Sequence, residues 1–446
     1  MTSVPDQNSE VDVKELNLTI DLCLRIGEML LANGAGAADV TATMGAVAHH
    51  LGLRHTDIDV TFTQVSMGYQ YDAAMPSLVM IRQVKQRDID YEDLTQVDHL
   101  VRDLLAGRLD LYLARNRMAT IVSVGHNRPR WAVTVATGVM CASVALFLGG
   151  GWMVVAIAFA AAASIDRVQL FLGRRRLPTF YLQVAGGVVA TLFAVGAAAS
   201  DLDVDPSLVV TANIIMLLAG IGFMGALQDA LSGFYVTAGA RIIEALLATA
   251  GIIAGVSGGL TLGELLGVDV GQLEPGASGW QDIGVLSVGA ALCAAAFAYS
   301  AYSPKRILLP IAVVAGGAAA IFRVIDDAGL GRTWAAATAA FAIGLVAYAV
   351  AGRVRVPPLV VVVSAIVPLL PGLSIYRGLS LMAEGGPAIS QGLLAMVTAA
   401  SVAIALASGV ILGEYVAQPV KREARKLEQR LAGPRLVGVF RARSKR

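Results

Sequence analysis

The residues best suited to chemistry are a few charged and polar side chains embedded in apolar sequence. Gln228-Asp229 is followed by Arg241 and Glu244, which lie three residues apart and therefore on one face of a helix. A charge at mid-bilayer costs roughly 2.5–3.5 kcal/mol, so each such residue needs a partner or a role. Arginine suits a carboxylate and an acidic side chain suits an ammonium, so this group predicts an inner vestibule that recognises a zwitterion. The alternative is an ion pair at a helix end.

Two apolar segments of membrane length are interrupted near their middles, the first by glycines and the second by Pro368–Gly372. A break frees backbone N–H and C=O groups, which are tolerated at membrane depth only where they line a cavity or are buried in protein. Paired interruptions in corresponding halves are the best sequence pointer to a transporter's site, although Gly and Pro also simply kink or pack membrane helices. The candidate pathway residues at these breaks are Asn213, Gly220, Ser364, Pro368, Pro371, Gly372, Tyr376 and Arg377.

The elements that must position these residues are membrane helices. The 446 residues are 56% hydrophobic and 15% charged, whereas a soluble domain carries roughly 25% charged residues. From Trp131 to about Gln418 the charges are confined to short clusters. Stretches near the roughly 20 residues that a bilayer requires number about ten: 131–149, 152–172, 179–199, 207–228, 236–260, 282–302, 307–325, 333–351, 358–380 and 388–417.

Loop charges predict the orientation of these spans. With ten spans, the basic clusters Arg174-Arg175-Arg176, Lys305-Arg306 and the tail after Gln418 all fall on one side, while Asp326-Asp327 falls on the other. Since positive charge concentrates in cytoplasmic loops, both termini are expected in the cytoplasm of a multi-pass protein of the cell membrane.

The chain also contains an internal repeat. Leu208-Val209-Val210 and Leu217-Leu218-Ala219-Gly220 resemble Leu359-Val360-Val361 and Leu369-Leu370-Pro371-Gly372, and weaker matches surround them in the same order. Because each copy holds five helices, an odd number, the second copy must be inverted relative to the first. Inverted repeats place the site at their interface near the midplane. Chance alignment of Ala-, Val- and Leu-rich helices is the alternative.

The fold predicted is therefore a mainly α membrane protein of about ten transmembrane helices in a 5+5 inverted repeat, preceded by a small cytoplasmic α+β domain. In that domain, Leu18, Leu22 and Ile26 recur at helical spacing, and two strands are expected around Ile58–Phe62 and Leu78–Met80 with a loop between them. The predicted regions are a disordered N-terminus (1–15), the α+β domain (16–127), two five-helix modules (128–270 and 271–418) and a basic tail (419–446).

Several function classes are disfavoured by missing motifs. The sequence contains no Walker loop, nucleotide fingerprint, zinc spacing or nucleophile elbow, so no enzyme activity, cofactor, metal or nucleic-acid partner is expected. Cys23, Cys141 and Cys293 lie far apart and are expected to be buried thiols. Asp166 and Arg167 adjoin the triple-arginine loop, where snorkelling to the surface is one explanation for them.

Taken together, these residues resemble the threonine/serine exporter family. The resemblance rests on Ala32–Asp39, on Gly225–Gly233 leading to Ala240–Ala245, and on Pro368–Gly372 followed by Ile375–Gly378. It covers almost the whole chain and implies export of threonine and serine driven by the proton motive force. Some relatives divide the two modules between separate proteins and are linked to dicarboxylate export.

The expected function is thus a secondary active exporter of small hydroxy amino acids that uses proton antiport and alternating access. Coupling requires a titratable carboxylate in the pathway, for which Asp229 and Glu244 are the first candidates and Asp166 the next. A dicarboxylate exporter and a passive channel or membrane scaffold are the alternatives. The N-terminal domain is expected to gate the inner mouth or to mediate assembly, and homo-oligomer formation stays open.

Overall fold

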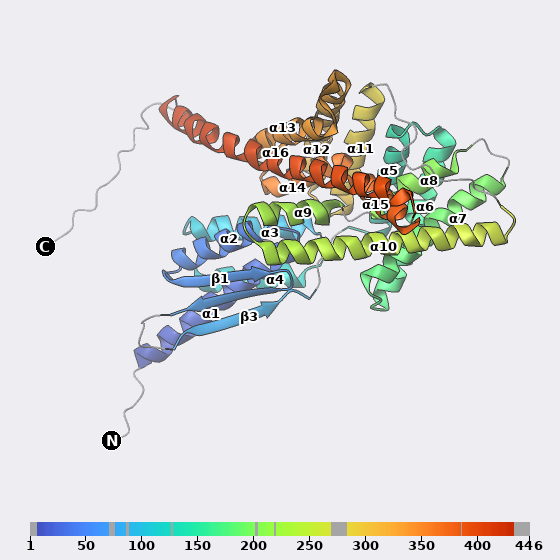
Figure 1. Ribbon diagram of the computed structural model, residues 1–446. Helices are drawn as coiled ribbons and strands as arrows, with labels where there is room; N and C mark the ends of the chain where they lie inside the picture. Colours follow the sequence, from blue (N-terminus) through green and yellow to red (C-terminus); the bar gives the residue numbers. More distant parts are fainter. Residues whose placement is uncertain are drawn as a thin grey trace.

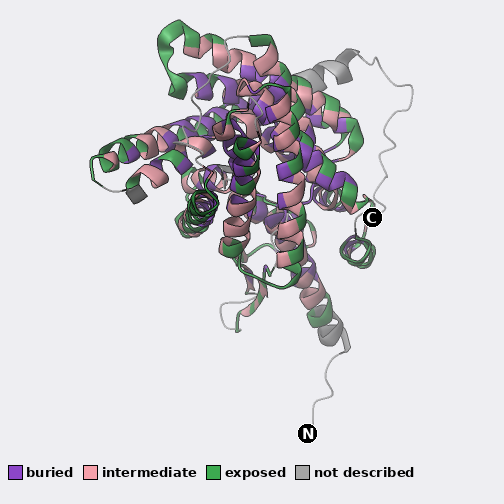
Figure 2. Cartoon of the chain, turned by 90° about the vertical axis from the view of Figure 1, so that its right-hand side faces the viewer, coloured by how far each residue is buried: buried purple, intermediate pink, exposed green. Residues whose placement is uncertain are grey.

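The computed structural model describes residues 7–70, 76–85, 89–125, 128–200, 204–217, 220–268, 283–384 and 386–431. An N-terminal domain lies against one end of a large helical bundle (Figure 1). Buried residues concentrate in the interior of the molecule, whereas exposed residues lie mainly on the outer faces and ends of the helices (Figure 2).

The N-terminal domain combines four helices with a three-stranded antiparallel sheet of order β1-β2-β3. Its elements are α1 (Gln7–Ala32), α2 (Ala37–His50), β1 (Thr56–Thr61), β2 (Gln64–Tyr69), β3 (Leu78–Gln83), α3 (Tyr91–Leu105) and α4 (Leu111–Ser123). Asp90 caps α3 by accepting the backbone N–H groups of Glu92 and Asp93, and Asp110 caps α4 in the same way through Leu113. The first helix begins at Gln7, inside the segment predicted to be disordered, while residues 1–6 lie outside the described part of the chain.

The prediction of two strands was wrong, because the middle strand β2 was assigned to a loop. Val65 and Met67 alternate with less buried neighbours in β2 and are fully buried. Gly68 suggested a turn, but it pairs with Asp57 of β1 and Val79 of β3 inside the sheet. A turn of only two residues separates β1 from β2, so the two strands appeared as one in the sequence pattern.

Eight helices among the described residues are long and apolar enough to cross a bilayer, with the candidate span Lys305–Leu330 including the π-helical turn η1 (Asp326–Leu330). The helices are α5 (Arg130–Phe147), α6 (Trp152–Arg174), α7 (Thr179–Ala199), α10 (Tyr235–Leu265), α11 (Ile283–Ser300), α12 (Lys305–Ile325), α13 (Arg332–Val354) and α16 (Ala388–Leu431). The last of these continues past the predicted start of the basic tail at residue 419.

The two interrupted segments account for the difference from the ten spans predicted, a count that the structure does not confirm. The second segment consists of α14 (Pro358–Ile366), the 3-10 turn η2 (Val367–Leu369) and α15 (Gly372–Glu384), and its two arms are bent by 49°, so it forms at most a ninth span. Pro368 and Pro371 each remove a backbone donor from the helix, which explains the bend. The first segment consists of two short helices, α8 (Pro206–Leu217) and α9 (Gly220–Leu231), and residues 218–219 between them lie outside the described residues.

Helix neighbours recur in the same pattern in residues 130–265 and 283–417. In the first half α5 packs on α6, α7 on α10 and α9 on α10; in the second, α11 packs on α12, α13 on α16 and α15 on α16. Contacts between the halves are also matched, since α5 meets α11, α9 meets α16 and α15 meets α10. The contacts within and between these two ranges therefore follow one common pattern.

Glycines permit the close approach of α7 to α10 and of α13 to α16. A Cβ added to Gly187 of α7 would lie 2.7 Å from the carbonyl oxygen of Ile252 in α10, and one added to Gly344 of α13 would lie 2.5 Å from that of Val410 in α16. Neither pair could approach so closely with a larger residue, so small residues set the helix spacing, as is common in membrane bundles.

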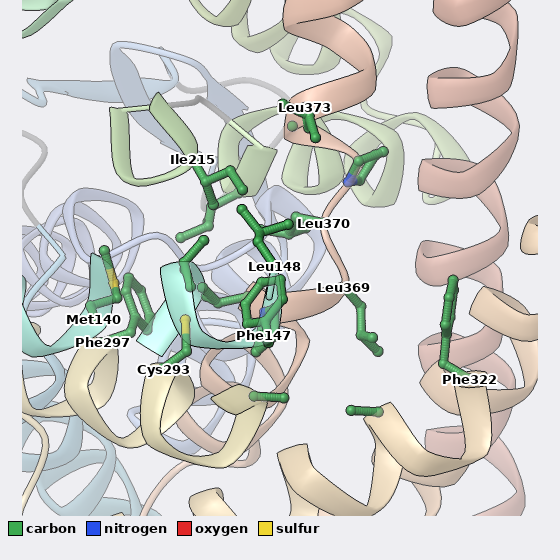
Figure 3. Close-up of a pocket in the computed structure, with 18 of the residues that line it drawn as sticks. Met140, Phe147, Leu148, Ile215, Cys293, Phe297, Phe322, Leu369, Leu370 and Leu373 are labelled. Atoms are coloured by element: carbon green, nitrogen blue, oxygen red, sulfur yellow. The ribbon is translucent and has the colours of Figure 1, made fainter. Parts of the chain in front are cut away.

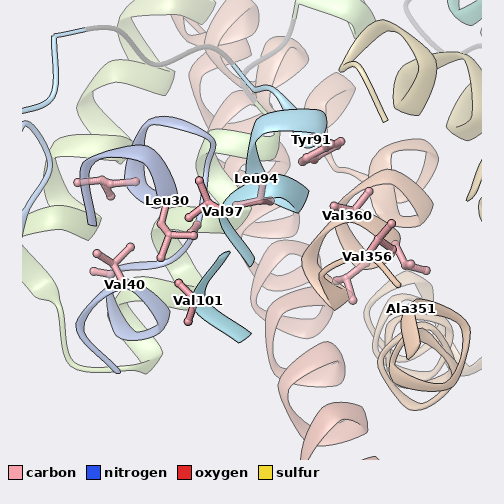
Figure 4. Close-up of a cluster of buried hydrophobic side chains, with 14 of the residues drawn as sticks. Leu30, Val40, Tyr91, Leu94, Val97, Val101, Ala351, Val356 and Val360 are labelled. Atoms are coloured by element: carbon pink, nitrogen blue, oxygen red, sulfur yellow. The ribbon is translucent and has the colours of Figure 1, made fainter. Parts of the chain in front are cut away.

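A continuous apolar cluster joins the N-terminal domain to the helical bundle. Leu30, Val40, Leu94, Val97 and Val101 of the domain belong to the same buried cluster as Ala351, Val356 and Val360 of the bundle, with Tyr91 between them (Figure 4). The Tyr91 ring also packs edge-on against Phe297 of α11, with ring centroids 6.4 Å apart. Because burial of apolar surface stabilises packing, the domain is an integral part of the fold in this structure.

Candidate functional site

The predicted Asp229–Arg241 group forms a buried ion pair that holds the N-terminal domain. Arg241 Nε lies 3.2 Å from Asp229 Oδ2, and the two side chains are 11% and 1% exposed. The other Asp229 oxygen accepts the backbone N–H of Ala37 at 2.8 Å, while Arg241 donates to the carbonyl of Ala35 at 3.1 Å. Since Ala37 is the first residue of α2, the carboxylate also sits at a helix N-terminus, where negative charge is favoured. We refer to Asp229 and Arg241 as the clamp.

The Asn33–Ala37 loop that the clamp holds is fixed from its other end as well. The Asn33 side chain donates to the carbonyl of Met29 and accepts the backbone N–H of Asp90. The next residue, Tyr91, donates its backbone N–H to the carbonyl of Ala301, just after α11. The segment Ala32–Asp39 therefore docks on the first half of the bundle, and the adjoining Asp90-Tyr91 docks on the second.

An acidic cavity of about 440 Å³ lies between the N-terminal domain and the bundle. Four carboxylates line it, from Asp39 and Asp98 of the domain, Asp229 of α9 and Glu414 of α16. The Asp39 side chain is exposed at this cavity. Desolvation by the surrounding protein nevertheless raises the pKa of its carboxyl, and the nearby negative charge of Asp229 raises this pKa further. Such a cavity attracts cations and the ammonium group of a zwitterion.

A smaller cavity of about 170 Å³ lies on the other side of Gln228. It is lined by Gln228, Arg241 and Glu244 together with apolar residues of both halves and of the N-terminal domain. Gln228 and Leu359 line both the small cavity and the acidic cavity, so they separate the two. The predicted group of Gln228, Arg241 and Glu244 is thus brought together around one space.

A central cavity of about 450 Å³ lies between the two halves of the bundle (Figure 3). One face of α11 borders this cavity for about 21 Å, because its lining residues recur at alternating spacings of four and three. These residues are Leu286, Ala290, Cys293, Phe297 and Ser300. The Pro368–Gly372 break and the first residues of α15 form another wall, so Pro368, Pro371 and Gly372 lie at this cavity. Only Arg332 is charged among the described lining residues.

Other predicted residues lie elsewhere. Asn213 and Ser364 are fully buried inside the bundle and line none of the three cavities; the Asn213 amide donates to the carbonyl of Val209. Tyr376 is buried and Arg377 is exposed on α15, both outside the cavity linings. Gly220 is the first residue of α9.

Asp166 does not line any of these cavities either. Its carboxylate accepts from Arg130 at 2.6 Å and from the Thr134 hydroxyl at 2.7 Å, and its side chain is 12% exposed. These contacts join α6 to α5 near the N-terminal domain. Asp166 is therefore engaged in helix packing in this structure, while its neighbour Arg167 is exposed.

The sequence interpretation missed some residues that the structure places at the cavities. Glu414 lies within the apolar part of α16, and an acidic residue in a membrane span is itself a signal of function. Asp39 had no such signal, because it belongs to a domain of ordinary composition. Ile221 and Leu370 are ordinary aliphatic residues whose position only the fold reveals.

The fold and cavities define a class: a multi-pass helical membrane protein with internal spaces between two similar halves. Comparison with known families is more specific. The threonine/serine exporter family matches residues 21–263, and a second family model, "Threonine/Serine exporter, ThrE", matches residues 286–416. The first match ends near the end of α10 and the second begins near the start of α11. This chain belongs to the threonine/serine exporter family.

Individual relatives agree with this assignment. The chain is 32% identical over 432 residues to the "Probable threonine/serine exporter" of Mycobacterium tuberculosis, covering 95% of this chain and 81% of the relative. It is 34% identical over 415 residues to the threonine/serine exporter of Corynebacterium glutamicum, covering 91% and 84%. A "Probable succinate transporter subunit YjjP" of Escherichia coli is 25% identical over 247 residues, which are 55% of this chain and 95% of that protein. No solved structure is significantly similar.

Proposed function

We propose that this chain exports threonine and serine across the cell membrane by alternating access between two inverted five-helix halves. The similarity to exporters of these amino acids over more than nine-tenths of the chain carries the proposal. The matched helix contacts of the two halves support the inverted arrangement, with each interrupted segment counted as one span. In this topology both termini and the N-terminal domain are cytoplasmic, and the acidic and small cavities lie on the loading side.

The central cavity is the proposed binding site. α15 begins at Gly372, and the first N–H groups of a helix have no partner within it, so Gly372, Leu373 and Ser374 present backbone donors at the cavity wall. A helix N-terminus favours a carboxylate. The amino acid would place its carboxylate there and its hydroxyl against Ser374 or Thr398, which line the same space. Arg332 lies on the same cavity and adds positive charge.

The acidic cavity favours an amino acid over a dicarboxylate. A molecule loaded from the N-terminal domain side would pass Asp39, Asp98 and Glu414. These carboxylates repel a dianion but attract the ammonium of a zwitterion. The dicarboxylate alternative depends on the Escherichia coli relative, whose similarity covers only about half of this chain.

Proton antiport requires a carboxylate that titrates during the cycle, and we propose Glu244 for this role because it lines the small cavity beside Arg241. Asp229 is the second candidate, since losing its charge would release the clamp. The contacts of Asp166 with Arg130 and Thr134 favour a packing role for that residue.

Counterflow in proteoliposomes tests the function directly. Vesicles loaded with unlabelled serine should accumulate external labelled serine transiently, and threonine should compete whereas succinate should not. An imposed pH gradient should drive accumulation, and Glu244→Gln should abolish that drive while sparing counterflow. Flux proportional to concentration without saturation would instead identify a passive channel, and absence of flux would favour a scaffold.

A further inference from the structure

Two aliphatic residues separate the central cavity from the small cavity. Ile221 and Leu370 are the residues that line both of these spaces among the described linings. A residue that borders two cavities forms part of the wall between them. Figure 3 shows Leu370 near Ile215 and Leu148, which also border the central cavity. The wall is therefore made where the two interrupted segments approach each other.

The two residues lie at the interruptions of the two segments, one in each half of the bundle. Ile221 is the second residue of α9, just after the interruption of the first segment, and Leu370 lies between η2 and α15 in the second. Each side chain is half-buried, so neither is locked into the fully packed core. Leu370 also lies in a short non-helical link, at the 49° bend between two helical arms.

We propose that Ile221 and Leu370 form an inner hydrophobic gate, closed in this structure, that keeps polar solutes of the loading side out of the central cavity. The inference rests on the proposed transport function for its role in the cycle, but its barrier is physical and can be measured separately. A zwitterion crossing an apolar constriction loses hydration without gaining hydrogen bonds, so two branched side chains suffice to oppose its passage. Opening requires α9 and the Leu370 link to separate.

The first test is the passive leak of a neutral polar solute, erythritol, from proteoliposomes that contain the full-length protein. Ile221→Ala and Leu370→Ala should each raise the leak about tenfold, which corresponds to ~1.4 kcal/mol of barrier. Ile215→Ala and Leu369→Ala are matched controls, because those residues line the central cavity but not the small one. The gate is refuted if the gate variants leak no more than these controls.

Thiol labelling keeps the inference testable if an alanine variant proves unstable. In a protein with Cys23, Cys141 and Cys293 replaced by serine, Leu369→Cys should react with a reagent from the small-cavity side only when Leu370 is replaced by glycine. Equal labelling with Leu370 intact would overturn the gate. Serine counterflow by the wild type is measured in parallel. If the wild type shows no counterflow while the gate variants leak erythritol, the transport proposal alone is rejected. If the wild type shows counterflow while the gate variants leak no more than the controls, the gate alone is rejected.

Discussion

Replacing Arg241 with alanine should loosen the N-terminal domain without unfolding it. The change leaves Asp229, which is 1% exposed, as a buried carboxylate without its ion-pair partner, and it removes the hydrogen bond to the Ala35 carbonyl. Breaking one side of a buried ion pair costs about 3–5 kcal/mol. A loss of this size corresponds to roughly two to three and a half powers of ten in the docking equilibrium.

Hydrogen exchange at Ala37 reports on this docking, because its N–H donates to Asp229. Exchange of a protected amide scales with the population of the open state. Peptides that contain Ala37 should therefore exchange roughly 100-fold faster or more in Arg241→Ala, a factor that follows from the lower energy limit above. Peptides from the α13–α16 pair should keep the wild-type rate.

Two further variants make the reasoning refutable. Arg167→Ala removes an exposed arginine from α6 and should leave exchange at Ala37 unchanged. The double variant Asp229→Asn with Arg241→Met removes both charges and should restore much of the protection, because the uncompensated charge is the main cost. Wild-type protection of Ala37 in Arg241→Ala would show that the ion pair does not hold the domain.

Three other outcomes follow from the structure. The raised pKa of Asp39 means that the folded state binds this proton more tightly than the unfolded state. Its contribution to stability is therefore present below the ordinary aspartate pKa near 4 and is lost as pH rises through the folded value, so Asp39→Asn should flatten the dependence of Tm on pH above about 4. Gly255→Ala should destabilise the α7–α10 pair by about 1–3 kcal/mol in a thermal unfolding assay, because the new Cβ would overlap the backbone of α7, whereas Gly258→Ala meets open space and should not. Asp166→Asn should lower the Tm but leave pH-driven serine accumulation intact, because Asp166 holds α5 and α6 together. Loss of accumulation without a change in Tm would instead indicate that Asp166 takes part in proton coupling.

The class of fold and the interrupted segments were predictable from the sequence. Apolar runs of membrane length and loop charges indicate membrane helices directly, and Pro368 and Pro371 can be identified as helix breakers without tertiary information. Three antiparallel strands are harder to distinguish from two when a two-residue turn and an internal glycine hide the middle one, as happened around Gly68. The number of spans depends on whether a bent segment crosses the bilayer, which residue types alone do not determine.

The site was predictable only where its chemistry is visible in one residue. Arg241 and Glu244 line the same small cavity, and their helical spacing already places them on one face of α10. The partner of Asp229 across the domain junction could not be predicted from the sequence. It is the backbone N–H of Ala37, 192 positions away in the chain, and every residue except proline carries such a donor. Asn213 and Ser364 matched each other in the repeat, but the rotation of their helices turns both into the core.

The clamp and the proposed gate are connected by a single helix. Ile221 lies near the beginning of α9 and Asp229 near its end, eight residues apart, which is about 12 Å along the axis. A helix of this length moves as a rigid unit, so displacement of the Asp229 end relative to the N-terminal domain must shift or tilt the Ile221 end against Leu370. Since Asp229 is bonded to Ala37 and Arg241 at one end, opening the gate strains the clamp. The N-terminal domain can therefore bias the gate without contacting the substrate, and variants of the clamp and of the gate should show coupled, non-additive effects on erythritol leak.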